Sequence, residues 1–263
     1  MTQTPKFGTL HLIPVGLAAT PANQWLPLAA QQCAGELTCY IAENAKTARA
    51  FLKTVPLQHI LQDVVIHELN PKVDDDTLAI WLKPLKSGVS LGLVSEAGCP
   101  AVADPGARVV AIAHQWGVPV KPWVGPSSIL LALMASGLDG QRFAFHGYAP
   151  IKPDERAKQI KAWETASAHN QQTQLMIETP YRNLAMFETL LKTLKSHTRL
   201  CIASDLTGPS ENVRTLTVQQ WASQTVPVTN DRPALFLFQA ASHTSAATAT
   251  PAKQSSPMRR AKQ

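Results

Sequence analysis

Short apolar runs rich in β-branched residues alternate with helical patterns through the first half of the chain. Such runs, bounded by polar segments, are typical of strands that are buried on both faces of a parallel sheet. Strands are expected at residues 9–15, 37–42, 63–67, 89–95 and 118–124, and helices at 47–53, 74–86 and 107–116. Because strands and helices alternate, this half predicts a mostly parallel sheet with helices on both faces.

The second half of the chain has a different pattern. Helices are expected at 127–137, 154–169 and 181–195, and strands at 142–146, 174–178, 199–204, 213–217 and 234–239. Short loops join the last strands, which favours antiparallel pairing. The sequence therefore predicts two α/β domains, an N-terminal one over residues 1–123 and a C-terminal one with a mixed sheet over residues 124–240.

Residues 241–263 form a low-complexity tail that is rich in Ala, Ser, Thr and Pro. The chain has a net charge of +6, and the four basic residues of this tail, which has no acid, account for +4 of it. The remaining +2 makes the body nearly neutral. We expect the tail to be a disordered basic extension, which serves solubility rather than RNA binding.

The start of the chain, MTQTPKFGTLHLIPVGLAAT, has the general look of a signal peptide. His11, Pro14 and Gly16 interrupt its apolar part, so we interpret it as a first strand with its turn and expect a cytoplasmic protein without a membrane span. The four cysteines form no CxxC pair and have no histidine-rich partner, so neither a metal site nor a disulfide framework is expected.

Three polar loops follow predicted strands and open helices: SEAGCPAVADPG at 95–106, GPSS at 125–128 and ETPYR at 178–182. In open α/β sheets, ligands bind beyond the carboxyl ends of the strands, where backbone N–H groups at helix N-termini are free. Each loop alone is compatible with a simple connector, in which Asp104, Ser127 or Ser128 caps a helix. Three such loops from both domains predict a shared ligand cleft, without the GxGxxG, phosphate-loop or nucleophile-elbow motifs.

The ordered set SEAGCPAVADPG, GPSSILLALMASGL, FAFHGYAP, IETPYRN and SDLTGPSENV resembles the tetrapyrrole methylase superfamily. Within it, the sequence is most similar to the ribosomal RNA small subunit methyltransferase I branch, which transfers methyl from S-adenosylmethionine to a ribose 2′-hydroxyl. The resemblance runs from about Gly8 to Gln239. It implies two α/β domains with the cofactor in the cleft between them, and a homodimer.

Carried over by position, the resemblance implies a set of residues that bind S-adenosylmethionine. The set consists of Ser95, Glu96, Ala97, Gly98, Cys99, Asp104, Pro126, Ser127, Ser128, Glu178, Thr179, Pro180 and Tyr181.

Two segments depart from the branch. Residues 14–20, PVGLAAT, stand where the branch has GNLxDIT, and residues 42–46, AENAK, stand where it has AEDTR. The second change replaces an acid by Asn44 and an arginine by Lys46. In the family these segments line the substrate side, so the departures bear on the RNA substrate rather than on the cofactor.

Methyl transfer to a hydroxyl requires that the partners be aligned and that a proton be removed from the acceptor. Glu43 and Glu96 are the candidate catalytic bases, and Lys46, Arg49 and Arg182 are the candidate substrate-binding residues that hold RNA phosphates. Equally, Glu43 is compatible with an ordinary surface ion pair to Lys46 or Arg49.

Two other functions remain open at this point. The first is carbon methylation of a tetrapyrrole, but such a substrate carries many carboxylates and calls for a cationic cleft, which the nearly neutral body does not favour. The second is a non-catalytic remnant that binds S-adenosylmethionine or RNA, for which the loss of the acid at Asn44 is the main argument.

Overall fold

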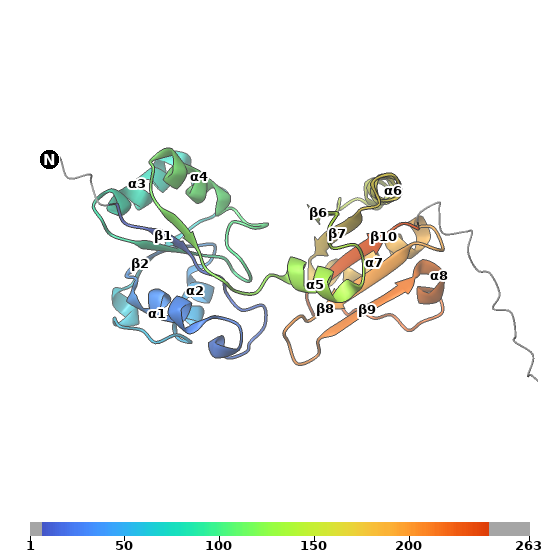
Figure 1. Ribbon diagram of the computed structural model, residues 1–263, viewed down its shortest axis with the longest axis horizontal. Helices are drawn as coiled ribbons and strands as arrows, with labels where there is room; N and C mark the ends of the chain where they lie inside the picture. Colours follow the sequence, from blue (N-terminus) through green and yellow to red (C-terminus); the bar gives the residue numbers. More distant parts are fainter. Residues whose placement is uncertain (1–6, 242–263) are drawn as a thin grey trace, which may run out of the picture.

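The computed structural model describes residues 7–241, so the predicted basic tail lies outside the described residues except for its first position. Two five-stranded sheets stand side by side, and the chain crosses from the first to the second through the segment between β5 (Val120–Pro122) and α5 (Ser128–Ser136) (Figure 1). The fold is thus the predicted α/β arrangement, with one sheet in each half of the chain.

All strands of the first sheet are parallel. Helices α1 and α2 cover one face and α3 and α4 the other, so each face has its own buried apolar cluster (Figure 1). The predicted parallel sheet with two covered faces is confirmed. Across the sheet the order is β3 (Val65–Glu68), β2 (Cys39–Ala42), β4 (Leu91–Val94), β1 (Leu10–Leu12) and β5 (Val120–Pro122), and the helices are α1 (Leu28–Glu36), α2 (Ala45–Leu52), α3 (Asp75–Lys86) and α4 (Ala107–Gln115).

Helix α1 was not predicted from the sequence, and its packing gives the reason. It buries mainly small residues, among them Ala30, Ala34 and Gly35, instead of a stripe of large apolar side chains. A Cβ atom on Gly35 would lie 1.9 Å from the Pro56 carbonyl oxygen, so the helix needs a glycine where the chain passes this closely. Its N-cap position is Pro27, which makes no capping hydrogen bond.

The second sheet is mixed, as predicted: β6 pairs with β7 in parallel and the other pairs are antiparallel. Helix α5 packs on one face, while α6, α7 and the short α8, which was not predicted, contribute to the core on the other face. The order is β6 (Phe143–Tyr148), β7 (Thr173–Glu178), β10 (Ala234–Gln239), β8 (Arg199–Ser204) and β9 (Asn212–Thr217), and the helices are α5 (Ser128–Ser136), α6 (Pro153–Asn170), α7 (Asn183–Thr193) and α8 (Val218–Trp221).

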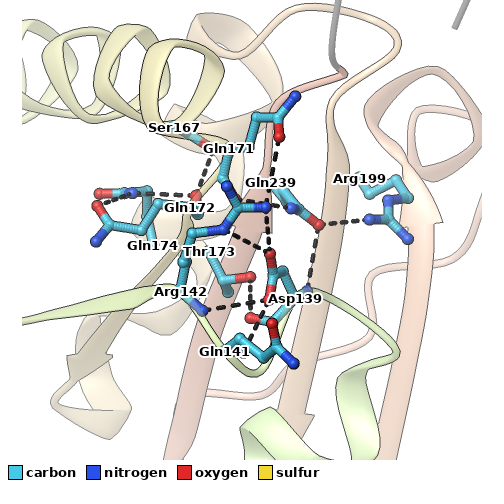
Figure 2. Close-up of polar contacts among 10 residues, drawn as sticks. All are labelled: Asp139, Gln141, Arg142, Ser167, Gln171, Gln172, Thr173, Gln174, Arg199 and Gln239. Carbon is cyan, nitrogen blue, oxygen red and sulfur yellow. Dashed lines mark hydrogen bonds and ion pairs between the residues drawn. The ribbon is translucent and has the colours of Figure 1, made fainter.

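A polar network fixes the end of β10 (Figure 2). The Oε1 atom of Gln239 accepts hydrogen bonds from Arg199 Nη2 at 2.5 Å and from the backbone N–H of Asp139 at 3.3 Å. Asp139 in turn pairs with Arg142, and its carbonyl accepts from the Thr173 hydroxyl at 2.8 Å. The network therefore ties together the first residues of β7 and β8, the segment before β6, and the last residue of β10.

At the opposite end of β10, one buried amide positions the chain that enters the strand. The Nδ2 atom of Asn183, at the start of α7, donates to the carbonyls of Thr229 and Arg232 at 2.9 and 2.8 Å. The residues that follow, Pro233 and Ala234, line a cavity described below. Asn183 thus anchors the second sheet at the end that faces this cavity.

Within residues 7–241, the helices include none that is long and apolar enough to cross a membrane.

Replacement of Asn183 by alanine is expected to lower the free energy of unfolding by about 1–2 kcal/mol, because two carbonyls lose their partner. Loss of the buried Oδ1 atom, which has no hydrogen-bond partner among the described residues, offsets part of this cost. Urea unfolding of Asn183→Ala tests the expectation. The control is Asn170→Ala, which changes an exposed residue at the end of α6 and should stay within about 0.5 kcal/mol of wild type. Equal stability of the two variants would contradict the anchoring role.

Candidate functional site

A cavity of about 320 Å³ lies between the two halves of the chain. It sits at the carboxyl ends of β2 and β4, where a parallel sheet leaves backbone groups free for a ligand. Both halves contribute to its wall: Leu17, Glu43, Ser95, Glu96, Ala97, Gly98, Cys99, Val102, Ala103, Asp104, Ser127, Ser128, Ile129, Phe145, Tyr148, Ile177, Glu178, Asp205, Leu206, Pro233, Ala234 and Leu235.

The loop at 95–106 forms one wall of this cavity. Gly98 exchanges two backbone hydrogen bonds of 2.9 Å with Val15, which join the loop after β4 to the segment after β1. Gly98 has a φ of +76°, a conformation that glycine adopts without strain. The buried hydroxyl of Ser95 lies 3.1 and 3.0 Å from the carbonyl oxygens of Ala97 and Gly98. The loop is therefore fixed in shape by hydrogen bonds within it and to Val15.

Asp104 closes the same loop on itself. Its Oδ1 atom accepts from the backbone N–H groups of Ala101 and Gly106 at 2.8 and 2.6 Å. Between these contacts, Ala101 and Ala103 have φ values of +66° and +61°, which cost free energy for residues with a side chain. Burial raises the pKa of Asp104, while the two hydrogen bonds act in the opposite direction. The carboxylate therefore holds a strained turn at the edge of the cavity.

Glu43 and Glu96, the two candidate bases, both line the cavity. Glu43 Oε2 accepts from the backbone N–H of Glu96 at 2.9 Å. Partial burial raises the pKa of Glu43; the Glu96 hydrogen bond opposes this, and the charges of Asp104 and Glu96 add to it. The ion pairs among residues 7–241 do not include Glu43, so the alternative of a surface pair with Lys46 or Arg49 is wrong.

Asn44, the residue that replaces an acid of the family pattern, has a clear structural task. It is the N-cap of α2, and its Oδ1 accepts from the backbone N–H groups of Lys46 and Thr47 at 2.9 and 3.3 Å. Asn and Asp are equally good N-caps. The change at Asn44 therefore preserves the helix start.

Glu178 reaches the cavity from the end of β7, and its side chain is fully buried. Its Oε1 atom accepts from the backbone N–H of Thr179 at 2.9 Å, and its Oε2 atom lies 2.9 Å from Arg182 Nη2. The same Arg182 nitrogen lies 3.2 Å from the carbonyl oxygen of Ala149. Arg182 is thus occupied inside the protein, away from the surface where a phosphate would bind.

Most predicted site residues come together in this cavity, but seven do not line it. Pro126 lies behind the wall, where its carbonyl accepts from Cys99 Sγ at 3.4 Å. Tyr181 is 70% exposed outside the cavity. Lys46 and Arg49 are exposed on α2. The full set outside the lining is Lys46, Arg49, Pro126, Thr179, Pro180, Tyr181 and Arg182.

Of the wall that the second half contributes, the sequence identified Ser127, Ser128 and Glu178 and missed the rest. Two recognised motifs carried a signal for it, since FAFHGYAP contains Phe145 and Tyr148, and SDLTGPSENV contains Asp205 and Leu206. Asp205 has a φ of +51° and accepts from the Ser210 N–H at 2.9 Å through Oδ2. The other lining residues that were missed are Leu17, Val102, Ala103, Ile129, Ile177, Pro233, Ala234 and Leu235.

The wall combines apolar side chains with carboxylates, which suits an organic ligand that carries hydroxyl or cationic groups. Within residues 7–241 no group of three His, Cys, Asp or Glu side chains is arranged to hold a metal ion.

Comparison with curated proteins finds relatives along most of the chain. Ribosomal RNA small subunit methyltransferase I of Xylella fastidiosa (strain Temecula1) is 33% identical over 235 residues, which cover 88% of this chain and 80% of that protein. Proteins of the same name from Mesorhizobium japonicum and Neisseria meningitidis serogroup B are 30% identical, over 78% and 80% of this chain and 68% of each relative. No protein-family model matches the sequence.

Solved structures share the fold at low sequence identity. The methyltransferase CobJ matches with a TM-score of 0.59 and 15% identity, over 89% of this chain and 94% of that chain. A conserved hypothetical protein from Aeropyrum pernix K1 matches with a TM-score of 0.60 and 15% identity, over 89% of this chain and 85% of that chain. These likenesses show a common fold.

Two substitutions at Asp104 separate its hydrogen bonds from its charge. Asp104→Ala removes the acceptor of two backbone N–H groups and is expected to lower the free energy of unfolding by about 2 kcal/mol. Asp104→Asn keeps an acceptor oxygen. Because burial raises the pKa of Asp104, its charge does not stabilise the fold, and the asparagine variant should match or slightly exceed wild type at pH 7. Urea unfolding measures both, and an equal loss in the two variants would contradict this account.

Proposed function

Since the chain belongs to the ribosomal RNA small subunit methyltransferase I family and is an S-adenosylmethionine-dependent methyltransferase, we propose that it methylates a ribose 2′-hydroxyl of ribosomal RNA. The observation that carries the proposal is the cavity between the two sheets, in which a fixed loop, two glutamates and the start of α5 converge. We also propose that the enzyme acts in the cytoplasm, because ribosomal RNA is made and assembled in that compartment.

The residues of the cavity fit S-adenosylmethionine, which supplies a methyl group on a positively charged sulfur. Its volume of about 320 Å³ lies within the range of small-molecule sites. Carboxylates suit the ribose hydroxyls and cationic groups of such a ligand, and the loop at 95–99 offers backbone groups at close range. We propose that this loop, Asp104, Ser127, Ser128 and Glu178 hold the ligand, and that Pro126 and residues 179–182 support them from outside.

Glu43 is the better of the two candidate bases. A general base works best when its pKa approaches the working pH, and burial moves the pKa of Glu43 in that direction. The hydrogen bond from the Glu96 N–H fixes the orientation of its carboxylate. Glu96 is exposed, so we assign it a positioning role through this backbone contact and through its charge.

The substrate-side features favour RNA over a tetrapyrrole. Lys46 and Arg49 are exposed on α2, which begins two residues after Glu43, and there they are placed to hold phosphates outside the cavity. A polycarboxylate macrocycle would instead bring its charges against Glu43, Glu96 and Asp104. The similarity to the methyltransferase CobJ, at 15% identity, is a similarity of fold, and it does not indicate which substrate this chain uses.

We propose that the two sheets belong to separate domains whose boundary lies at residues 123 and 124, and that the enzyme is a homodimer. In support of the dimer, Leu130 and Met134 lie one turn apart on α5 and are 57% and 78% exposed. The other side of α5 is buried on the second sheet. An apolar surface of this kind calls for a partner, and a second copy of the chain satisfies it.

Transfer of labelled methyl tests the function. We expect S-adenosylmethionine labelled in its methyl group to label ribosomal RNA from cells that lack the gene, and nuclease digestion to release a 2′-O-methylated nucleoside. Glu43→Gln keeps the acceptor for the Glu96 N–H but removes the base, so the rate should fall about 100-fold or more. Because the pKa of Glu43 is raised, its carboxylate becomes protonated at a higher pH than that of an ordinary glutamate. As the pH is lowered, the wild-type rate should therefore begin to fall above the ordinary pKa of glutamate.

If active wild-type protein leaves the ribosomal RNA unlabelled, the proposal that ribosomal RNA is the substrate is wrong. A Glu43→Gln variant with the wild-type rate and pH profile would remove Glu43 from the mechanism and transfer the role to Glu96. The matched control is Glu188→Gln, which changes an exposed glutamate on α7 and should leave both readouts unchanged.

The dimer proposal predicts a change in assembly on substitution of α5. Sedimentation equilibrium should give twice the chain mass for wild type and the chain mass for the double variant Leu130→Glu, Met134→Glu, because charges would be buried at the interface. Leu28→Glu, at a 65% exposed position on α1, is the control and should stay dimeric. A monomeric wild-type protein would contradict the proposal.

A further inference from the structure

The cavity has an unusual charge composition. Five carboxylate side chains line it, those of Glu43, Glu96, Asp104, Glu178 and Asp205, and among the described residues its lining contains no Lys, Arg or His. A site that held an anionic ligand would be expected to carry basic side chains. The cavity therefore favours a ligand with a positive charge.

Two of the five carboxylates are balanced by arginines outside the lining. Glu178 Oε2 lies 2.9 Å from Arg182 Nη2, and Asp205 Oδ2 lies 3.8 Å from Arg232 Nη1. The ion pairs among residues 7–241 include neither Glu43 nor Glu96 nor Asp104. The uncompensated negative charge thus belongs to these three residues.

The three carboxylates lie on the same edge of the first sheet. Glu43 directly follows β2, and Glu96 and Asp104 belong to the loop that follows its neighbour β4. Their charges act on one another, since those of Asp104 and Glu96 raise the pKa of Glu43. Backbone N–H groups hold the carboxylates of Glu43 and Asp104, so hydrogen bonds fix them without neutralising them.

We propose that Glu43, Glu96 and Asp104 select the positively charged methyl donor over its neutral product, an inference that rests on the proposed function. S-adenosylmethionine and S-adenosylhomocysteine share the adenosine and the amino-acid groups, and they differ in the methyl group and in the charge on sulfur. When the methyl group is transferred, the electron pair of the broken C–S bond stays on sulfur, and the sulfur becomes a neutral thioether. The attraction to the three carboxylates therefore exists for the donor and is lost in the product.

Charge, rather than loop geometry, is the property at issue. The hydrogen bonds of Glu43 and Asp104 need only an acceptor oxygen, which Gln and Asn also provide. The Glu96 side chain is exposed, and its contact with Glu43 is made by its backbone N–H. The variants Glu43→Gln, Glu96→Gln and Asp104→Asn therefore remove one charge each and keep the hydrogen bonds of the loop.

Titration calorimetry with both ligands tests the proposal on the full-length protein. In each of the three variants, affinity for S-adenosylmethionine should fall about fivefold, while affinity for S-adenosylhomocysteine should stay within about twofold of wild type. Raising the salt concentration should weaken donor binding to wild type and leave product binding unchanged. The control Glu188→Gln removes an exposed charge on α7 and should change neither affinity.

Each other result is decisive. If both ligands bind to wild type and the variants weaken them equally or not at all, the charge selection is wrong, while the proposed cofactor site stands. If the salt series weakens both ligands equally, selection by charge is also wrong. If neither ligand binds to wild type, the proposed function fails and this inference fails with it.

Discussion

The pair of backbone hydrogen bonds between Val15 and Gly98 is the contact on which the site depends. It fixes the loop after β4 against the segment after β1, at the edge where the parallel strands of the first sheet end. From this fixed loop, the Glu96 N–H reaches the Glu43 carboxylate and the Cys99 thiol reaches the Pro126 carbonyl before α5. This pair of hydrogen bonds thus fixes the loop that orients the Glu43 carboxylate and that contacts the second half of the chain.

The sequence predicted the elements that carry strong local patterns. The parallel and mixed sheets follow from apolar runs, and the start of α3 follows from its aspartates, since Asp74 accepts from the Thr77 N–H at 2.8 Å. Helix α1 was not predicted, because it packs through small residues and has no capping side chain. The first wall of the cavity was predictable because its loop is a single motif. The second wall was predictable only at Ser127, Ser128 and Glu178, because its other residues come from β6, β7, β10 and the turn at Asp205 and meet only in the folded chain.

Residue type alone misled the interpretation where a side chain serves the fold. Asn44 suggested lost chemistry but caps α2, and Asp and Asn do this equally well. Arg182 suggested phosphate binding but is 13% exposed and paired with the buried Glu178. Removing such a partner would leave a buried carboxylate uncompensated, which is costly in a protein interior. The presence of a cation in a motif therefore does not make it available to a ligand.

The two halves of the chain contribute different kinds of interaction to one cavity. The first half supplies charges that backbone N–H groups hold in place, with Glu43 and Asp104 each fixed this way. The second half supplies apolar side chains such as Leu206 and Leu235, together with a Glu178 whose charge is balanced by Arg182. Backbone donors orient a carboxylate without adding a full positive charge, so the field of the carboxylate still reaches the ligand. Basic side chains in place of these backbone N–H groups would hold the carboxylates equally firmly. Their positive charges, however, would cancel the electric field of the carboxylates, which distinguishes a cationic ligand from a neutral one.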